Sequence, residues 1–355
     1  MVVRSFRIGI SGSCSSTFKL SSDFNAPNPD SDSITIVDAI TLEFVSEISV
    51  GDNPITVSIT PDSRNALVTN YDSATLSVID LNQAKQIAQY SVGHMPYGVV
   101  TNGVNGFITE FGIGSVSIID LDTGELLTRI RVDPFPSGIA LSQNAEKLLI
   151  THLFTGKITV IDVSTRTIIG TVSTGSETNI SQFIVIDQKG EKAYIPQTRS
   201  NSTNMTLLFD TTVFPIVNVL DLDKLQLLTK ERITLDTADK PVNMPFSVAL
   251  SPDKHILYVA NAGSNNVSVI DLRTNKGLAN LTVGSNPRGI AIAPDESRVF
   301  VNNVLDGTVS VIDTETLVVA NTIQITSIPL NPTLLAGKEL FNSASSPVLT
   351  NDNWI

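Results

Sequence analysis

Apolar and polar residues alternate in short stretches, and the segment that contains these stretches recurs along the chain. In residues 51–80 three such stretches are separated by turn-forming residues, at 56–59, 66–69 and 76–79. Alternation with a period of two is typical of β-strands that have one buried face. A fourth alternating stretch, 86–92, precedes the next copy, which begins at Gly93. Each copy is therefore predicted to form four short antiparallel strands.

An aspartate ends the third predicted strand of every copy and sets the register of the repeat. These residues are Asp38, Asp80, Asp120, Asp162, Asp221, Asp271 and Asp313. Successive aspartates are 40 to 59 residues apart, and most intervals are 40 or 42. A period near forty with β-alternation inside it predicts an all-β fold, a seven-bladed β-propeller of four-stranded antiparallel blades. We expect the aspartates to close tight turns by hydrogen bonds to the backbone.

The end of the repeat near residue 326 sets the predicted domain boundary. We expect a seven-bladed β-propeller over residues 1–326 and a C-terminal linker and tail over residues 327–355. Residues 2–8 alternate like an additional strand, and such a strand often completes the last blade of a propeller. Residues 317–325 already offer the last copy a fourth strand, so the way in which the ring closes stays open.

Two insertions lengthen the fifth and sixth copies. The first, 198–216, lies between the second and third predicted strands, and the second, 235–242, precedes the sixth copy. In a four-strand meander both positions lie at the same end of the blade, so both insertions are expected at one face. Residues 205–215 include several apolar and aromatic side chains. The first insertion is therefore a candidate lid or docking surface, with a loop that packs on itself as the alternative.

Composition narrows the classes of partner. The chain has 355 residues, of which 41% are hydrophobic and 16% charged, as in ordinary globular proteins. Its net charge of −12 argues against nucleic acid and anionic membrane surfaces, because both require clustered Lys and Arg. Cys14 is the only cysteine of this sequence, which excludes an intrachain disulfide and covalent c-type haem attachment within it. We expect no membrane insertion, since no apolar run is long enough, and a monomer, since a closed ring hides most sheet edges.

A ring of polar residues lies ten positions before the blade aspartates, at the predicted end of the second strand. Its members are Asn28, Asn70, Glu110, His152, Asn261 and Asn303, with Gln197 as the equivalent in the fifth copy. An asparagine side chain at this position can form hydrogen bonds with the backbone groups of a turn. Glu110 and His152 are less suited to that task, so we expect that something other than the turn selected them. A second ring on the same face follows the first proline of each blade and includes Tyr97, Phe246 and Arg288, with His94 in the same set of loops.

Two chemistries fit these rings. In acyl hydrolysis, Glu110 or His152 would be the general base, and Arg288 or His94 would stabilise the oxyanion. In a metal site, oxygens of Asn70, Glu110, Asn261 and Asn303 would surround Ca²⁺. No catalytic motif of fixed spacing accompanies either set, so whether the chain is an enzyme stays open. The leading prediction is a binding site without metal or cofactor, with calcium as the alternative. Its predicted ligand-binding residues are Asn70, Tyr97, Gln197, Phe246, Asn261 and Asn303.

Several segments resemble the YVTN β-propeller repeats of bacterial and archaeal surface proteins, over residues 9–326. The segments are VTN at 68–70, SVID at 77–80, PD at 252–253, YVAN at 258–261, SVID at 268–271 and GSNPRG at 284–289. The resemblance implies an extracellular, periplasmic or cell-surface binding module. It would bind a small molecule or a protein through the face that carries the 198–216 and 235–242 insertions. Similar propellers include lactonases with Glu, His and Arg at the channel mouth, some of them calcium-dependent, which makes a lactonase-type hydrolase the alternative.

The C-terminal tail carries a second resemblance. Residues 337–341 (GKELF) and 351–355 (NDNWI) look like the lead-in to a di-haem peroxidase-like cytochrome domain. In that family a CxxCH haem motif follows, and this sequence ends before any. We therefore expect no haem in this chain.

Overall fold

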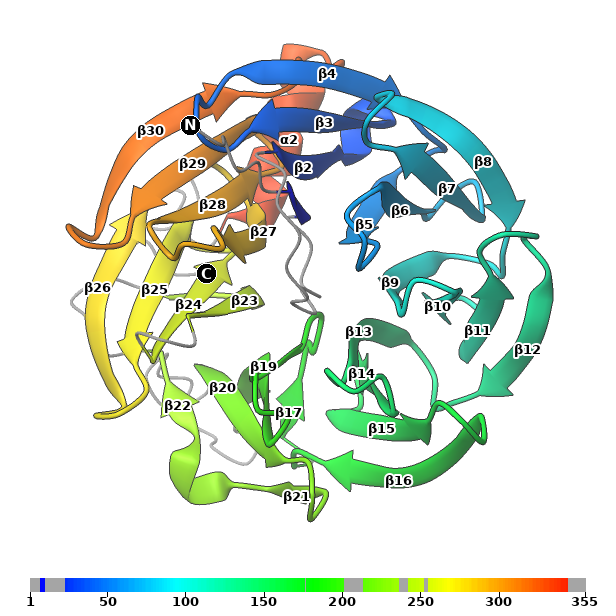
Figure 1. Cartoon of the computed structure of the whole chain (residues 1–355). Helices are drawn as coiled ribbons and strands as arrows, with labels where there is room; N and C mark the ends of the chain where they lie inside the picture. Colours follow the sequence, from blue (N-terminus) through cyan, green and yellow to red (C-terminus); the bar gives the residue numbers. More distant parts are fainter. Residues whose placement is uncertain are drawn as a thin grey trace.

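Seven β-sheets surround a central channel in the computed structural model (Figure 1). The structure describes residues 7–9, 23–175, 177–200, 213–235, 242–251 and 255–343. The predicted seven-bladed all-β propeller is confirmed, and each blade aspartate ends a third strand, as in β7 (Thr75–Asp80) and β29 (Thr308–Asp313).

The blades follow one another in chain order. Blade one has β1 (Arg7–Gly9), β2 (Asp23–Asn28), β3 (Ser33–Asp38) and β4 (Phe44–Ser49). Blade two has β5 (Pro54–Ile59), β6 (Asn65–Asn70), β7 and β8 (Lys85–Ser91). Blade three has β9 (Pro96–Thr101), β10 (Asn105–Glu110), β11 (Ser115–Asp120) and β12 (Leu126–Arg131). Blade four has β13 (Pro136–Leu141), β14 (Lys147–His152), β15 (Lys157–Asp162) and β16 (Thr167–Ser173).

The remaining blades include the one irregular sheet. Blade five has β17 (Thr178–Asn179), β18 (Val185–Ile186), β19 (Lys192–Ser200), β20 (Val213–Asp221), β21 (Gln226–Leu227) and β22 (Ile233–Thr234). Its inner and outer strands are each split in two, because β17 and β18 both pair with β19, and β21 and β22 both pair with β20. Blade six has β23 (Pro245–Ser251), β24 (Ile256–Asn261), β25 (Asn266–Asp271) and β26 (Lys276–Thr282). Blade seven has β27 (Pro287–Ile292), β28 (Arg298–Asn303), β29 and β30 (Val318–Gln324).

Apolar side chains form a layer between each pair of neighbouring blades. Between blades three and four, for example, Phe107 and Ile150 are both fully buried in one cluster. Alternate residues of a strand point to opposite faces, so each blade supplies side chains to the layers on both sides. This packing fixes the blades relative to one another and holds their inner strands around the channel.

The N-terminal strand belongs to blade one rather than blade seven. β1 pairs in parallel with β2, where Arg7 lies opposite Asp23. Blade seven is complete with its own fourth strand, β30. The ring therefore closes by packing between blades one and seven, around Ala26 and Phe300. The N-terminal strand does not complete the last blade, which answers the question that the sequence left open.

The described parts of the two insertions are integrated into the fold. Residues 198–200 and 213–216 extend the β19–β20 hairpin, with Ser200 opposite Val213. Leu235 and Val242 are buried between blades five and six. Residues 201–212 and 236–241 lie outside the described residues, so the prediction of a lid stays a prediction.

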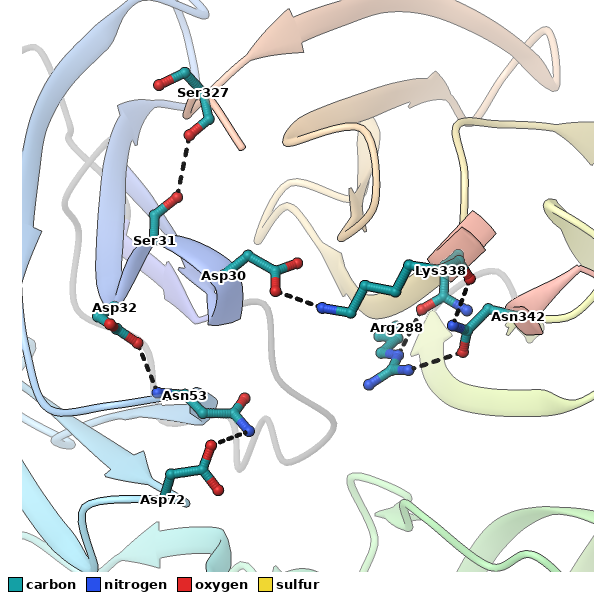
Figure 2. A network of polar contacts seen from close by, with 10 residues as sticks. Asp30, Ser31, Asp32, Asn53, Asp72, Arg288, Ser327, Lys338 and Asn342 are labelled. Carbon is teal, nitrogen blue, oxygen red and sulfur yellow. Dashed lines mark hydrogen bonds and ion pairs between the residues drawn. The ribbon is translucent and has the colours of Figure 1, made fainter. Parts of the chain in front are cut away.

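A short helix follows the last blade. α2 (Pro332–Asn342) begins after Asn331, whose side chain accepts a hydrogen bond from the Leu334 amide at 2.9 Å. Lys338 forms an ion pair with Asp30, which lies in η1 (Pro29–Ser31) of blade one, and Asn342 contacts Arg288 at the start of blade seven (Figure 2). α2 therefore joins the first and last blades at the channel mouth. In the described residues no helix is both long and apolar enough to cross a membrane.

Candidate functional site

The side chains of the predicted Asn ring form hydrogen bonds inside their own blades. We call each such residue at the end of a second strand, with the third-strand side chains that it contacts, a clamp. The Asn70 side chain donates hydrogen bonds to the hydroxyls of Thr75 and Ser77, both at 2.9 Å. Asn303 repeats this geometry with Thr308 at 3.0 Å and Ser310 at 2.9 Å. Each asparagine ends the second strand, is fully buried and bonds to the third strand. The clamp thus ties together the two strands of the central hairpin of the blade.

Asn261 and Gln197 hold the corresponding positions in blades six and five. Asn261 donates to the side chains of Asn266 at 2.8 Å and Ser268 at 2.9 Å. Gln197 accepts a hydrogen bond from Asn218 at 2.6 Å and is itself fully buried. These residues were predicted to bind a ligand, and the structure places their side chains within their own blades.

Glu110 fills the clamp position of blade three with a charged group. Its carboxylate accepts hydrogen bonds from the Gly93 amide at 2.7 Å, from Ser115 at 2.5 Å and from Ser117. Arg129 pairs with it at 2.8 Å. Burial alone would raise the pKa of Glu110, but these hydrogen bonds, with that from Arg129 the strongest, hold the pKa below its usual value.

His152 fills the same position in blade four. Its Nε2 lies 2.8 Å from the Thr159 hydroxyl, and its Nδ1 lies 3.2 Å from the Pro134 carbonyl oxygen. A carbonyl oxygen only accepts, so we assign the proton of the neutral ring to Nδ1. Burial lowers the pKa of His152, although the hydrogen bond to Pro134 opposes that shift. Both ring nitrogens are occupied, and neither faces a ligand.

Tyr97, Phe246 and Arg288 come together at the mouth of the channel. Phe183 lies between the first two, with ring centroids 6.2 Å from Tyr97 and 5.1 Å from Phe246. The Arg288 guanidinium lies 5.3 Å from the centroid of Phe246. Tyr97 donates to Gln182 at 2.5 Å, and burial raises the pKa of Tyr97. These side chains fill the channel, and the cavity that Phe246 and Arg288 line has room for only one or two water molecules.

A continuous series of aromatic rings crosses blades two to four on the same face. We call this series the aromatic arc, and it comprises Tyr71, Phe111, Phe135 and Phe154. Successive ring centroids are 6.2, 5.2 and 5.1 Å apart. Phe135 and Phe154 are 42% and 58% exposed, which is unusual for large apolar side chains in contact with each other.

His94 lies beside the aromatic arc. Its carbonyl oxygen accepts a hydrogen bond from the Gly112 amide at 3.1 Å, directly after Phe111. A Cβ atom on Gly112 would lie 2.5 Å from the His94 Nδ1, so the imidazole rests against this glycine. His94 is exposed, in contrast to His152.

The sequence analysis missed the aromatic arc, although a signal for it was present. Tyr71 and Phe111 directly follow the ring residues Asn70 and Glu110, and Phe135 directly precedes the first proline of blade four. Aromatic residues next to both predicted rings, in consecutive blades, indicate a shared surface. In the described residues no group of three or more His, Cys, Asp or Glu side chains is placed to hold a metal ion.

The chain is similar to known propellers. The family model of the Cytochrome D1 heme domain matches residues 210–333, which run from the second half of blade five to the start of α2. Hydrazine synthase from Kuenenia stuttgartiensis is a solved structure with a similar fold, at a TM-score of 0.78 and 19% identity. That likeness covers 87% of this chain and 95% of the other and concerns the fold. No curated protein sequence matches this chain.

The expectation of no cofactor, with calcium as the alternative, is contradicted. Residues 210–333 match a haem domain, and the matched region lies mostly within the propeller rather than after it. The expectation rested on the missing CxxCH motif, which excludes only covalent attachment. Haem can also be held by a side-chain ligand such as histidine without any cysteine.

The interior of the described channel does not fit a haem, whereas the surface of its mouth does. The interior cavity holds one or two water molecules, and both nitrogens of His152 are engaged. At the surface, His94 supplies an exposed imidazole and the aromatic arc supplies a broad apolar face. An imidazole ligand next to apolar rings is a donor set that suits a tetrapyrrole.

Proposed function

We propose that this protein is a haem-binding propeller module that uses the channel-mouth face of blades two to four. His94 would hold the iron, and the aromatic arc would contact the flat face of the macrocycle. The observation that carries the proposal is an exposed imidazole packed against Gly112, directly after Phe111 of the aromatic arc, in which the half-exposed Phe135 and Phe154 meet edge to face. The match to a haem domain supports the class of ligand. A bound haem supplies an iron centre whose use in electron transfer or ligand binding depends on its surroundings.

Titration with hemin, followed by the Soret absorbance, tests the proposal. The wild-type chain should bind hemin saturably. His94→Ala should weaken binding at least about tenfold, which corresponds to roughly 1.4 kcal/mol. Phe135→Ala should have a smaller effect, because it removes one stacking contact of the arc.

His255→Ala is the matched control. His255 is also exposed, but it lies in the turn between β23 and β24, at the opposite face of the ring. Loss of an imidazole there should leave hemin binding unchanged. Equal affinities of the wild type and His94→Ala would refute the proposed iron ligand, and an absence of saturable binding would refute the function.

Other parts of the sequence-based interpretation remain predictions. These are the extracytoplasmic location, the monomeric state, the absence of nucleic-acid partners and the resemblance to YVTN propellers and lactonases. The lactonase alternative would need Glu110 or His152 to reach a substrate, and both side chains are buried and hydrogen-bonded within their blades. Turnover of lactones by the purified chain would support that alternative.

A further inference from the structure

Arg288 has an unusual set of partners for a partly buried cation. Its Nε donates to the Asn286 side-chain oxygen at 2.6 Å, and Nη2 donates to that of Asn342 at 3.3 Å. Both partners are neutral amides; Asp30, which is paired with Lys338, acts on Arg288 through its charge, but no carboxylate of the described residues lies within ion-pair distance of this guanidinium. Buried charges in proteins are normally paired with an opposite charge. The guanidinium therefore has capacity for an anion.

The cavity beside Arg288 is small in the ligand-free protein, but its lining resembles that of a ligand pocket. Phe246, Phe183 and Ile55 provide apolar walls. Asn302 also lines the cavity, is only 1% exposed, and has a buried side-chain oxygen without a hydrogen-bond partner among the described residues. Apolar walls with a few convergent polar groups are typical of small-molecule sites.

α2 lies beside this pocket and is held by few contacts, since Asn342 reaches Arg288 although no residue of the helix lines the cavity. The helix buries none of its residues, and Phe341 on it is 90% exposed. The side chains that fasten it are Lys338, paired with Asp30, and Asn342, bonded to Arg288 (Figure 2). The Asn342 contact is long for a hydrogen bond to a guanidinium. A carboxylate in the place of the Asn342 amide would accept a shorter, charge-assisted hydrogen bond from Nη2.

We propose that Arg288 binds the carboxylate of a small organic acid with a flat apolar body, and that Asn342 occupies the position of that carboxylate in the ligand-free protein. The apolar body would lie against Phe246 and Phe183. Binding would displace Asn342, release the C-terminal end of α2 from blade seven, and free the Arg288 side chain, which lines the cavity, to move and make room. This site is separate from the proposed haem site, because neither His94 nor the aromatic arc takes part in it.

Calorimetric titration of the full chain with benzoate tests the proposal. Wild type should bind benzoate saturably, and Arg288→Gln should bind it at least about tenfold more weakly, as expected for loss of a charge-assisted pair. Asn342→Ala should bind more tightly than wild type, because the internal competitor is gone. Arg273→Gln is the matched control, since Arg273 is an exposed arginine in the turn after β25 and should not affect binding.

Three results would overturn the proposal. Arg288→Gln could bind benzoate as well as the wild type does, or Asn342→Ala could show no gain in affinity. Inorganic phosphate could bind as tightly as benzoate, which would mean that the apolar walls contribute nothing. Thermal melting of each variant checks its fold, and Arg288→Lys keeps the positive charge if Arg288→Gln fails to fold. His94→Ala should leave benzoate binding unchanged, so failure of the haem proposal is distinguishable from failure of this one.

Discussion

Blades two and three perform the same structural task with different side chains. In blade two, the neutral Asn70 joins the second and third strands through two hydroxyl groups. In blade three, Glu110 accepts hydrogen bonds at the equivalent position and introduces a buried negative charge. The difference shows that the position requires a polar side chain that reaches the third strand, and that amide chemistry is only one way to meet this requirement.

In blades two and three the fourth strand supplies a partner that matches the charge of the clamp. Arg129 on β12 lies opposite Ser117, and Gln89 on β8 lies opposite Ser77 in the same register. Arg129 supplies the cation that Glu110 needs, whereas Gln89 donates a hydrogen bond to Thr75 at 3.0 Å. The clamp residue on the second strand and its partner on the fourth strand therefore differ together between the two blades, which is a packing reason for Glu110 at this position.

The largest expected effect follows from breaking the charged clamp. Arg129→Gln leaves the buried Glu110 carboxylate without its counter-charge and should destabilise the fold by about 3 kcal/mol. Adding Glu110→Asn converts blade three to the arrangement of blade two and should restore most of that loss. Urea unfolding of the two single variants and the double variant measures this coupling. A double variant no more stable than Arg129→Gln would show that the two clamps are not interchangeable.

Removing a neutral clamp should have a smaller effect. Asn303→Ala deletes the hydrogen bonds to Thr308 and Ser310 and should cost about 2 kcal/mol, since the buried Ser310 hydroxyl and the partly buried Thr308 hydroxyl lose a partner. Asn321→Ala, on the exposed outer strand of the same blade, is the control and should change stability by less than about 0.5 kcal/mol. Equal losses in both variants, measured by urea unfolding, would contradict a special role for the clamp.

The parts of the structure that repeat could be predicted from the sequence. Asp313 accepts hydrogen bonds from the amides of Glu315 and Thr316, at 3.1 and 2.8 Å, so its spacing marks a local turn that every blade needs. The number of blades followed from counting such turns. The contacts that make the candidate sites join distant residues, as Arg288 and Asn342 do. No periodic pattern records such a pair, so the position of α2 emerged only from the structure, whereas the aromatic arc had a signal beside both predicted rings that was missed.

Protonation of His152 and protonation of Glu110, the two titratable clamp residues, should lower the stability of the fold in different pH ranges. Burial holds the folded-state pKa of His152 below its ordinary value of 6.5. Below that value the unfolded chain therefore binds more protons than the folded one, and stability falls as the pH drops from 6.5 towards the folded-state pKa. For Glu110 the folded pKa also lies below its ordinary value, 4.5, so its contribution is lost only below that pH.

His152→Asn should remove the loss of stability that begins near pH 6.5. It should keep the hydrogen bond to Thr159, as Asn70 does with Ser77. Asp133 and Lys157 also act on the charged form of His152, with opposite signs, and both remain in the variant. Urea midpoints measured from pH 7.5 to pH 5 should therefore decline more steeply for the wild type than for His152→Asn. Parallel declines would mean that His152 is not the group whose protonation destabilises the fold. The clamp also bears on the haem proposal, because His152 is buried with both ring nitrogens engaged, and His94 remains the exposed imidazole at this face.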